Sequence, residues 1–258
     1  MVIETIALSI VQGITEFIPV SSSGHLFYMG QIFMHTAYNL PFMVSVHMGS
    51  ALAIVLYFSQ RLKKMFISLL KIKNSYYSEE KQLWKYILIG SIPAGIIGVA
   101  FEPLIEKIAT TSLVGICWVI NGVILVCGEI LSQKKDQKQI DMYIALFVGI
   151  SQAIAILPGI SRSGATITAA RVSGIQPEKA FEFSFFLGII AIAGSFILEV
   201  FKKPAGFGLF CIMAGLSTFL FGYFALFILS KAVNHNKMKW FGFYTIVVGI
   251  IALARGEL

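Results

Sequence analysis

Residues 12–25, QGITEFIPVSSSGH, place a carboxylate, an amide, three serine hydroxyls and an imidazole within a strongly apolar stretch. Gln12 and Glu16 are four residues apart, so a helix puts them on one face. Ser22 and His25 are three apart and face the same way if a second helix begins near Ser22. A hydroxyl beside a titratable imidazole is typical of nucleophilic and general acid–base chemistry. We therefore expect catalytic roles for Glu16, Ser22 and His25.

A second polar stretch, LPGISRSGAT at residues 157–166, offers complementary chemistry. Pro158 and Gly159 are expected to end one helix, because proline disfavours continuation and glycine accepts left-handed backbone. A short helix then starts near 161–163, with its unpaired amides and positive dipole end at the tip. With the Arg162 guanidinium these groups form an anion cradle suited to phosphate. The residues expected to bind substrate phosphate are Ser161, Arg162, Ser163 and Thr166.

A purely structural interpretation of the second stretch has its serines cap a helix while Arg162 extends toward the headgroups. Arg162 lies well inside an apolar region, however. A charge at the bilayer centre costs roughly 2.5–3.5 kcal/mol even on the lenient insertion scale, and such charges mark functional sites. We therefore expect a catalytic role for Arg162.

Together the two stretches fit phosphoryl transfer. A hydroxyl or a water attacks, the imidazole moves the proton, and the arginine holds the charge that develops. Either Ser22 is the nucleophile with His25 as its base, or His25 activates water directly. Glu16 and Gln12 are candidates to hold a divalent cation, Mg²⁺ or Ca²⁺, between phosphates. Glutamine is neutral, so this site should hold the cation less tightly than one with two carboxylates.

The composition indicates a polytopic membrane protein. Of the 258 residues 57% are apolar and 13% charged, with a mean hydropathy of +0.83, whereas soluble proteins have about a quarter of their residues charged. The net charge of +7 would suit nucleic acid. Lys and Arg nevertheless gather in short segments between apolar runs, as juxtamembrane residues do, so we expect no nucleic-acid partner. The three cysteines lie in apolar runs without metal-type spacing and are interpreted as small buried residues.

Six apolar runs approach the roughly 20 residues that a spanning helix requires. They are residues 41–58, 84–101, 112–131, 181–200, 207–229 and 239–254. Two further regions, 1–33 and 141–174, break at Pro19 and at Pro158–Gly159 and then become apolar again. We interpret them as re-entrant helix pairs, because irregular backbone at membrane depth is tolerated only where protein or a polar cavity surrounds it.

The distribution of basic residues predicts the orientation. If the first span runs from outside to inside, fifteen of the twenty Lys and Arg residues fall in inside segments and four in outside segments. The inside segments are 59–85, 132–141, 171–180 and 231–239. This asymmetry predicts a multi-pass protein of the plasma membrane with both termini outside and a site that opens outward.

An internal repeat relates the two polar stretches. A shift of 140 residues aligns identical residues in the same order: Gln12 with Gln152, Ser21 with Ser161, and Ser23–Gly24 with Ser163–Gly164. The halves, about 1–131 and 141–258, each hold one re-entrant pair and three spans, so the second half is inverted. We thus expect one all-α polytopic membrane domain, 1–258, with six transmembrane helices and two re-entrant helix pairs in an inverted-topology repeat. Such repeats place their binding site at the repeat interface.

The motifs also carry a resemblance to a known family. The segments QGITE at 12–16, PVSSSGH at 19–25 and PGISRSGAT at 158–166 resemble the motifs of the undecaprenyl-pyrophosphate phosphatase family of the bacitracin-resistance type. That family carries a (Glu/Gln)-x-x-x-Glu stretch before Pro-Val-Ser-Ser-x-Gly-His, and Pro-Gly-x-Ser-Arg-Ser-x-x-Thr in its second half. The resemblance extends over essentially the whole chain.

The resemblance implies a membrane hydrolase that depends on a divalent cation. It would convert undecaprenyl (polyprenyl) pyrophosphate to the monophosphate and inorganic phosphate, recycling the lipid carrier for cell-wall synthesis. Its partners would be this lipid substrate and the surrounding membrane lipid, with a homodimer also considered. The positions that match family functional residues are Glu16, Ser22, His25, Ser161, Arg162 and Thr166. Gln12 matches the first position of the carboxylate motif, where Glu also occurs.

Two other functions compete with hydrolysis. A transporter or flippase for polyprenyl phosphate would share the inverted repeat and the anion cradle, but it has no evident need for His25 beside Ser22. A structural membrane subunit leaves Glu16 and Arg162 unexplained. Near these motifs, His47 lies within a span and either supports the site or simply packs, and packing is slightly favoured. Glu129 and Glu182 lie near span ends, where carboxylates usually face water, and Glu182 is a weak candidate for supporting the site.

Overall fold

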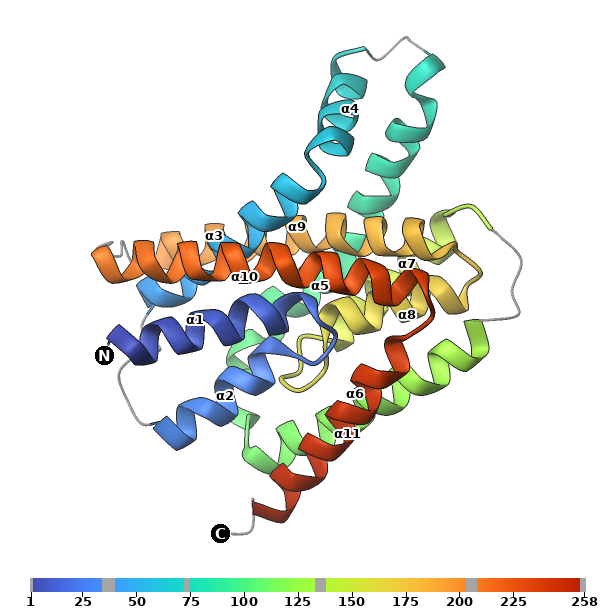
Figure 1. The fold of residues 1–258 in the computed structure, drawn as a ribbon. Coiled ribbons are helices and arrows are strands. Elements are labelled where there is room, and N and C mark those ends of the chain that lie inside the picture. Colours follow the sequence, from blue (N-terminus) through green and yellow to red (C-terminus); the bar gives the residue numbers. More distant parts are fainter. Residues whose placement is uncertain (1, 34–39, 72–74, 133–137, 203–207, 256–258) are drawn as a thin grey trace.

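The computed structural model describes residues 2–33, 40–71, 75–132, 138–202 and 208–255. These residues form eleven α-helices and one 3₁₀ turn, with no β-strand among them (Figure 1). The helices are α1 (Val2–Phe17), α2 (Ser22–Phe33), α3 (Leu40–Tyr57), α4 (Ser59–Leu70), α5 (Ser78–Ile108), α6 (Thr111–Ser132), α7 (Met142–Ile154), α8 (Arg162–Val172), α9 (Pro177–Lys202), α10 (Leu209–Asn234) and α11 (Met238–Arg255). Of the predicted domain 1–258, positions 1, 34–39, 72–74, 133–137, 203–207 and 256–258 lie outside the described residues.

Five helices, α5, α6, α9, α10 and α11, are long and apolar enough to cross a bilayer. The remaining predicted span, 41–58, corresponds to α3. Together with α4, which follows after an 82° bend, it is also long and apolar enough to cross a bilayer. Large apolar side chains cover the outer surfaces of these helices, for example Ile96 on α5 and Leu220 on α10, each 62% exposed. The chain is therefore a multi-pass membrane protein, as its composition predicts.

Two helix pairs interrupt the sequence of spans at the predicted breaks. α1 and α2 are separated around Pro19, and α7 and α8 are separated around Pro158–Gly159. α7 ends at Ile154, and turns at 155–160 separate it from α8. Gly24 lies inside α2, where a Cβ atom would come within 3.1 Å of the Cα of Gly159.

The helices cross closely where glycines meet. A Cβ atom at Gly149 of α7 would lie 2.3 Å from the carbonyl oxygen of Gly90 on α5. One at Gly13 of α1 would lie 2.8 Å from a backbone carbonyl oxygen of α10. α6 and α11 cross in the same way, since a Cβ at Gly122 would lie 2.5 Å from the carbonyl oxygen of Gly242. Small residues at crossings are typical of membrane helices, because close backbone approach replaces the hydrophobic effect as the source of packing energy.

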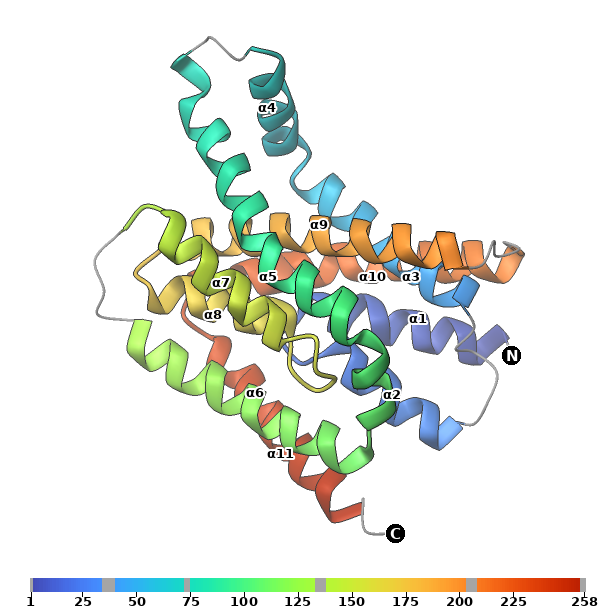
Figure 2. The same ribbon diagram turned by 180° about the vertical axis from the view of Figure 1, so that it is seen from behind.

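α9 carries much of the buried apolar core. Its phenylalanines pack against one another and against Phe58, which joins α3 to α4. The ring centroids of Phe181 and Phe185 are 4.7 Å apart, and those of Phe58 and Phe181 are 5.6 Å apart. In Figures 1 and 2, α9 and α10 lie alongside α3, while α6 and α11 cross beneath α8 and the α1–α2 pair. The two broken helix pairs thus lie between these two groups of longer helices.

Glu129 and Glu182, near span ends, were expected to lie where carboxylates usually face water. Both make contacts within the protein instead. Glu129 is 5% exposed, and its Oε2 accepts a hydrogen bond from the backbone N–H of Lys239 at 3.0 Å. Glu182 accepts a hydrogen bond from Nε of Arg61 on α4 at 2.9 Å. Both carboxylates join helices that are distant in sequence.

The crossing of α5 and α7 gives a stability prediction. Gly149→Ala should force these backbones apart and destabilise the fold by about 1–3 kcal/mol, the usual cost of overpacking. Gly194→Ala on α9 is the matched control, since a Cβ there meets nothing within 4 Å. Thermal unfolding midpoints in one detergent should fall for the first variant only. Equal midpoints would contradict this packing.

Candidate active site

The two breaks meet at Ser21. Its backbone has φ of +68°, a left-handed conformation that is uncommon for residues other than glycine. Its Oγ accepts hydrogen bonds from the backbone N–H of Gly24 at 3.3 Å and from that of Gly159 at 3.0 Å. One serine hydroxyl therefore caps α2 and also holds the turn before α8.

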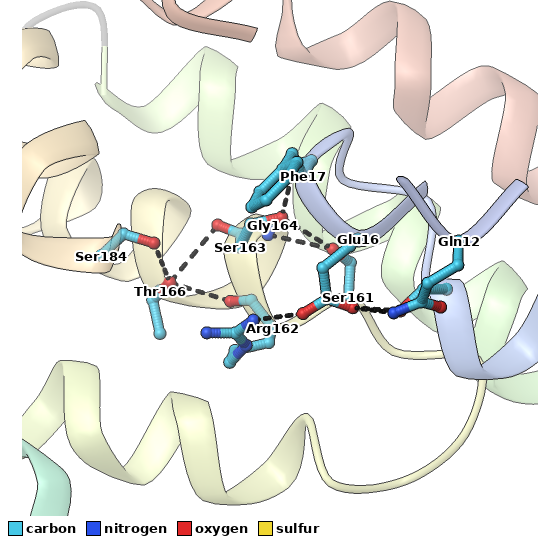
Figure 3. A network of polar contacts seen from close by, with 10 residues as sticks. Gln12, Glu16, Phe17, Ser161, Arg162, Ser163, Gly164, Thr166 and Ser184 are labelled. Carbon is cyan, nitrogen blue, oxygen red and sulfur yellow. Dashed lines mark hydrogen bonds and ion pairs between the residues drawn. The ribbon is translucent and has the colours of Figure 1, made fainter. Parts of the chain in front are cut away.

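The N-terminus of α8 is capped in a matching way by Ser161, whose Oγ accepts from the backbone N–H of Gly164 at 3.2 Å. Ser163 donates its hydroxyl to the carbonyl oxygen of Phe17 at 2.9 Å, which links α8 to the end of α1 (Figure 3). Thr166 shares a 2.6 Å hydrogen bond with Ser184 of α9. These three predicted phosphate-binding hydroxyls thus hold α8 in place in this structure.

Glu16 is the centre of the site. One carboxylate oxygen, Oε1, pairs with Nη2 of Arg162 across the two breaks (Figure 3). The other oxygen, Oε2, accepts from Nε2 of Gln12 at 3.1 Å and from the hydroxyl of Ser22 at 2.6 Å. The structure therefore brings together four predicted site residues, which come from α1, α2 and α8.

The ion pair is largely enclosed but still accessible. The side chains of Glu16 and Arg162 are 10% and 19% exposed. Arg162 lies against α9 at Gly188, where a Cβ atom would come within 2.1 Å of its Nη1. A glycine at this point of α9 thus leaves the space that the guanidinium occupies.

His25 does not join this group. Its Nδ1 lies 2.8 Å from the carbonyl oxygen of Ser21, so that nitrogen carries the proton. Its Nε2 accepts from the hydroxyl of Tyr244 on α11 at 2.8 Å. The imidazole also stacks on the Tyr244 ring and meets the edge of Trp118. Although Ser22 and His25 are three residues apart, the first turns to Glu16 and the second to α11, contrary to expectation.

Two further groups near Glu16 have unused hydrogen-bonding capacity. Oε1 of Gln12 is buried and has no hydrogen-bond partner among the described residues. The same holds for Nδ1 of His47 on α3, which lies close enough to Glu16 to interact with its charge. Buried polar atoms are usually satisfied, so these two are available to a ligand. For His47, packing had been slightly favoured over a role in supporting the site.

Asn121 is a site residue that sequence reasoning missed. This fully buried side chain of α6 donates from Nδ2 to the carbonyl oxygen of Pro19 at 3.0 Å. Its Oδ1 accepts from the backbone N–H of Ser161 at 2.9 Å. Trp118, one turn earlier, donates from Nε1 to the carbonyl oxygen of Val20 at 3.0 Å. The available signal was an amide in the middle of an apolar span, where an unsatisfied polar group is costly.

This arrangement has the parts of a phosphoryl-transfer site. A hydroxyl is hydrogen-bonded to a carboxylate, and a guanidinium lies on the other side of the same carboxylate. An arginine at a helix N-terminus favours an anionic ligand. Within the described part of the chain, no three His, Cys, Asp or Glu side chains gather closely enough to hold a metal ion.

Comparison with known proteins shows which family the chain resembles. The profile of the family described as Bacitracin resistance protein BacA matches residues 5–251. The chain is 36% identical to the undecaprenyl-diphosphatase of Desulforapulum autotrophicum, over 97% of each chain. It is 36% identical to that of Korarchaeum cryptofilum, over 97% of this chain and 98% of the relative. It is 34% identical to undecaprenyl-diphosphatase 1 of Clostridioides difficile, over 98% of this chain and 95% of the relative. The chain therefore belongs to the bacitracin resistance protein BacA family.

Proposed function

We infer that this chain is an undecaprenyl-diphosphatase, which hydrolyses undecaprenyl diphosphate within the membrane to the monophosphate and inorganic phosphate. The observation that carries this inference is the group formed by Glu16, Arg162 and Ser22 between two helix breaks. The relatives named undecaprenyl-diphosphatase match nearly the whole chain. No observation favours the alternative of a polyprenyl-phosphate transporter. Hydrolysis regenerates the lipid carrier for cell-wall synthesis and accounts for bacitracin resistance in the family description.

Arg162 is proposed as the main ligand of the terminal phosphate. The planar fork of its guanidinium suits phosphate oxygens. Without substrate its charge is balanced by Glu16, so an incoming phosphate competes with this carboxylate for the guanidinium. Ser161, Ser163 and Thr166 remain predicted phosphate ligands, and each would have to share its hydroxyl with the bonds that hold α8.

The proposed nucleophile is Ser22 or a water in its place. In the serine route, Ser22 Oγ attacks the terminal phosphorus and its proton passes to Glu16 Oε2, to which it already donates. The bond from phosphorus to the bridging oxygen breaks, and undecaprenyl phosphate leaves. A water then hydrolyses the phosphoserine. In the water route, the water attacks directly and loses its proton to a nearby base. His25 remains a predicted base and would have to leave Tyr244 to act.

A divalent cation, Mg²⁺ or Ca²⁺, is proposed as cofactor. The fit rests on the free, buried Oε1 of Gln12 beside the Glu16 carboxylate. Two protein oxygens are few, but Mg²⁺ is commonly bound by one or two carboxylates together with substrate phosphates. When bound, the cation would neutralise charge on the diphosphate. Gln12 and Glu16 would then hold it against the substrate.

The proposed membrane arrangement is six spans and two re-entrant pairs in one domain with halves about 1–131 and 141–258. Matching contacts support the inverted repeat. Ser21 and Ser161 cap the second helix of each pair through the residue three positions later. α1 packs on α10, and α7 packs correspondingly on α5, each through a close glycine contact. The excess of basic residues on one side supports termini outside and a site that opens outward. A homodimer remains a proposal.

The direct test is release of inorganic phosphate from undecaprenyl diphosphate by the purified chain with Mg²⁺ or Ca²⁺. Arg162→Ala and Glu16→Gln should each lower kcat/KM by about 10²–10³, the usual effect of removing a group that stabilises charge in the transition state. Arg255→Gln is the control, since this arginine is exposed at the end of α11. No release by the unaltered chain with either cation would refute the proposed function.

The cation proposal predicts a specific effect at position 12. Gln12→Glu adds a second carboxylate as a metal ligand, so it should tighten Mg²⁺ or Ca²⁺ binding about tenfold or more. Calorimetry without substrate and activity after chelation would measure this change. Gln60→Glu, at an exposed position of α4, is the control and should leave cation affinity unchanged. If Gln12→Glu binds neither cation more tightly, Gln12 is not a ligand.

Asn121 is proposed as a positioning residue, because it bonds to both breaks. Asn121→Leu should separate Arg162 from Ser22 and lower kcat up to about a hundredfold, the cost of a 1 Å misplacement. Combined with Arg162→Ala, its effect on kcat should be strongly non-additive, since both changes disrupt one unit.

Thr245→Val is the control for Asn121. It removes a buried hydroxyl that lies 3.5 Å from Nδ2 of Asn121 without touching either break. It should lower the unfolding midpoint while kcat stays near that of the unaltered chain. Additive effects of Asn121→Leu and Arg162→Ala would show that Asn121 serves stability alone.

A further inference from the structure

The hairpin formed by α4, a short turn at Ser75–Tyr77 and the start of α5 stands out from the bundle (Figures 1 and 2). α4 turns by 82° away from α3. α4 carries Arg61, Lys63 and Lys64, and basic side chains are costly in the hydrocarbon core. These charges favour a position of α4 at the level of the lipid headgroups, at the C-terminal end of α3.

α4 is amphipathic, and much of its apolar face is uncovered. Met65 is fully buried toward the protein, whereas Phe66, Leu69 and Leu70 are 57%, 46% and 85% exposed. Uncovered apolar side chains of this size are costly in water and favourable at the boundary between headgroups and acyl chains. The rest of the protein thus leaves one apolar side of α4 uncovered, where lipid acyl chains can contact it.

The same hairpin is strongly basic. Residues 59–85 contain seven Lys and Arg but two acidic residues, Glu79 and Glu80. Lys63 and Lys64 on α4 are exposed. On a helical projection Lys63 lies beside the exposed apolar face and Lys64 lies on the polar side. Lysine stems can follow apolar surface while their ammonium groups reach phosphates.

The hairpin is also held in a defined position. Arg61 of α4 donates from Nη1 to Glu80 of α5 at 2.8 Å and from Nε to Glu182 of α9 at 2.9 Å. Trp84 of α5 donates from Nε1 to the carbonyl oxygen of Met65 at 3.0 Å. The acidic residue nearest to α4 is thus already paired, which leaves Lys63 and Lys64 for an external anion.

We propose that α4 is a docking surface for the anionic phospholipids of the leaflet at the C-terminal end of α3. Phe66, Leu69 and Leu70 enter the acyl boundary, and Lys63 and Lys64 bind headgroup phosphates. A basic amphipathic helix is attracted to anionic lipid both by apolar burial and by charge. This surface is distinct from the Glu16–Arg162 site, so its test is independent of the proposed hydrolysis.

The test compares lipid retention by the full chain. After purification from vesicles of phosphatidylcholine mixed with phosphatidylglycerol, native mass spectrometry should show several-fold preferential retention of phosphatidylglycerol. Lys63→Gln with Lys64→Gln should abolish most of this preference. The control is Lys179→Gln with Lys237→Gln, which removes equal charge from exposed lysines outside the hairpin and should keep it. High salt should weaken the preference, because surface charge is screened.

A second measurement locates the helix. The Trp84 ring lies 5.8 Å from that of Phe66, so brominated phosphatidylglycerol should quench Trp84, an effect identified by its loss in Trp84→Phe. Equal retention of the two lipids, equal loss in the control pair, or quenching unchanged by Trp84→Phe would overturn the proposal. Concentration-dependent dimers lost in Phe66→Ser would also overturn it, because a second copy would then cover the apolar face.

Discussion

The ion pair between Glu16 and Arg162 is the constraint on which the site depends. Removing either partner would leave an uncompensated charge in an enclosed apolar region, which is strongly unfavourable. The pair therefore holds the two helix breaks against each other, and Gln12 and Ser22 satisfy the second carboxylate oxygen. The same groups that stabilise the site without substrate are those that an incoming phosphate would engage.

Bringing two charged side chains together inside a membrane requires irregular backbone, and irregular backbone requires partners. Ser21, Ser161 and Asn121 supply them by bonding to amide and carbonyl groups that the helices leave open. Asn121 alone among these three bonds through its amide nitrogen to one break and through its amide oxygen to the other. The long helices α6, α9 and α10 then enclose this polar centre and present apolar side chains outward. The polar groups of the site thus lie inside the bundle, and the apolar side chains that contact lipid lie on its outer surface.

The structure adds three observations to the predicted division of labour. Ser22 is hydrogen-bonded to Glu16, so the carboxylate is the base nearest to the hydroxyl, whereas His25 joins α2 to α11 through Tyr244. His47, for which packing was favoured, lies near Glu16 with a free ring nitrogen. The hydroxyls of Ser161, Ser163 and Thr166, which were expected to bind phosphate, hold α8 in place.

The helical class, the six apolar runs and the two breaks could be predicted from the sequence, because they follow from local composition, proline and glycine. The shared face of Gln12 and Glu16 could be predicted too, since helical periodicity places residues four apart together. Contacts across 146 residues of chain, such as that of Glu16 with Arg162, could not be predicted in this way and are seen in the folded bundle. The tertiary structure likewise decided the direction of His25 and the role of Asn121. Side-chain rotation and contacts between distant helices depend on how the whole bundle packs, and local spacing does not encode them.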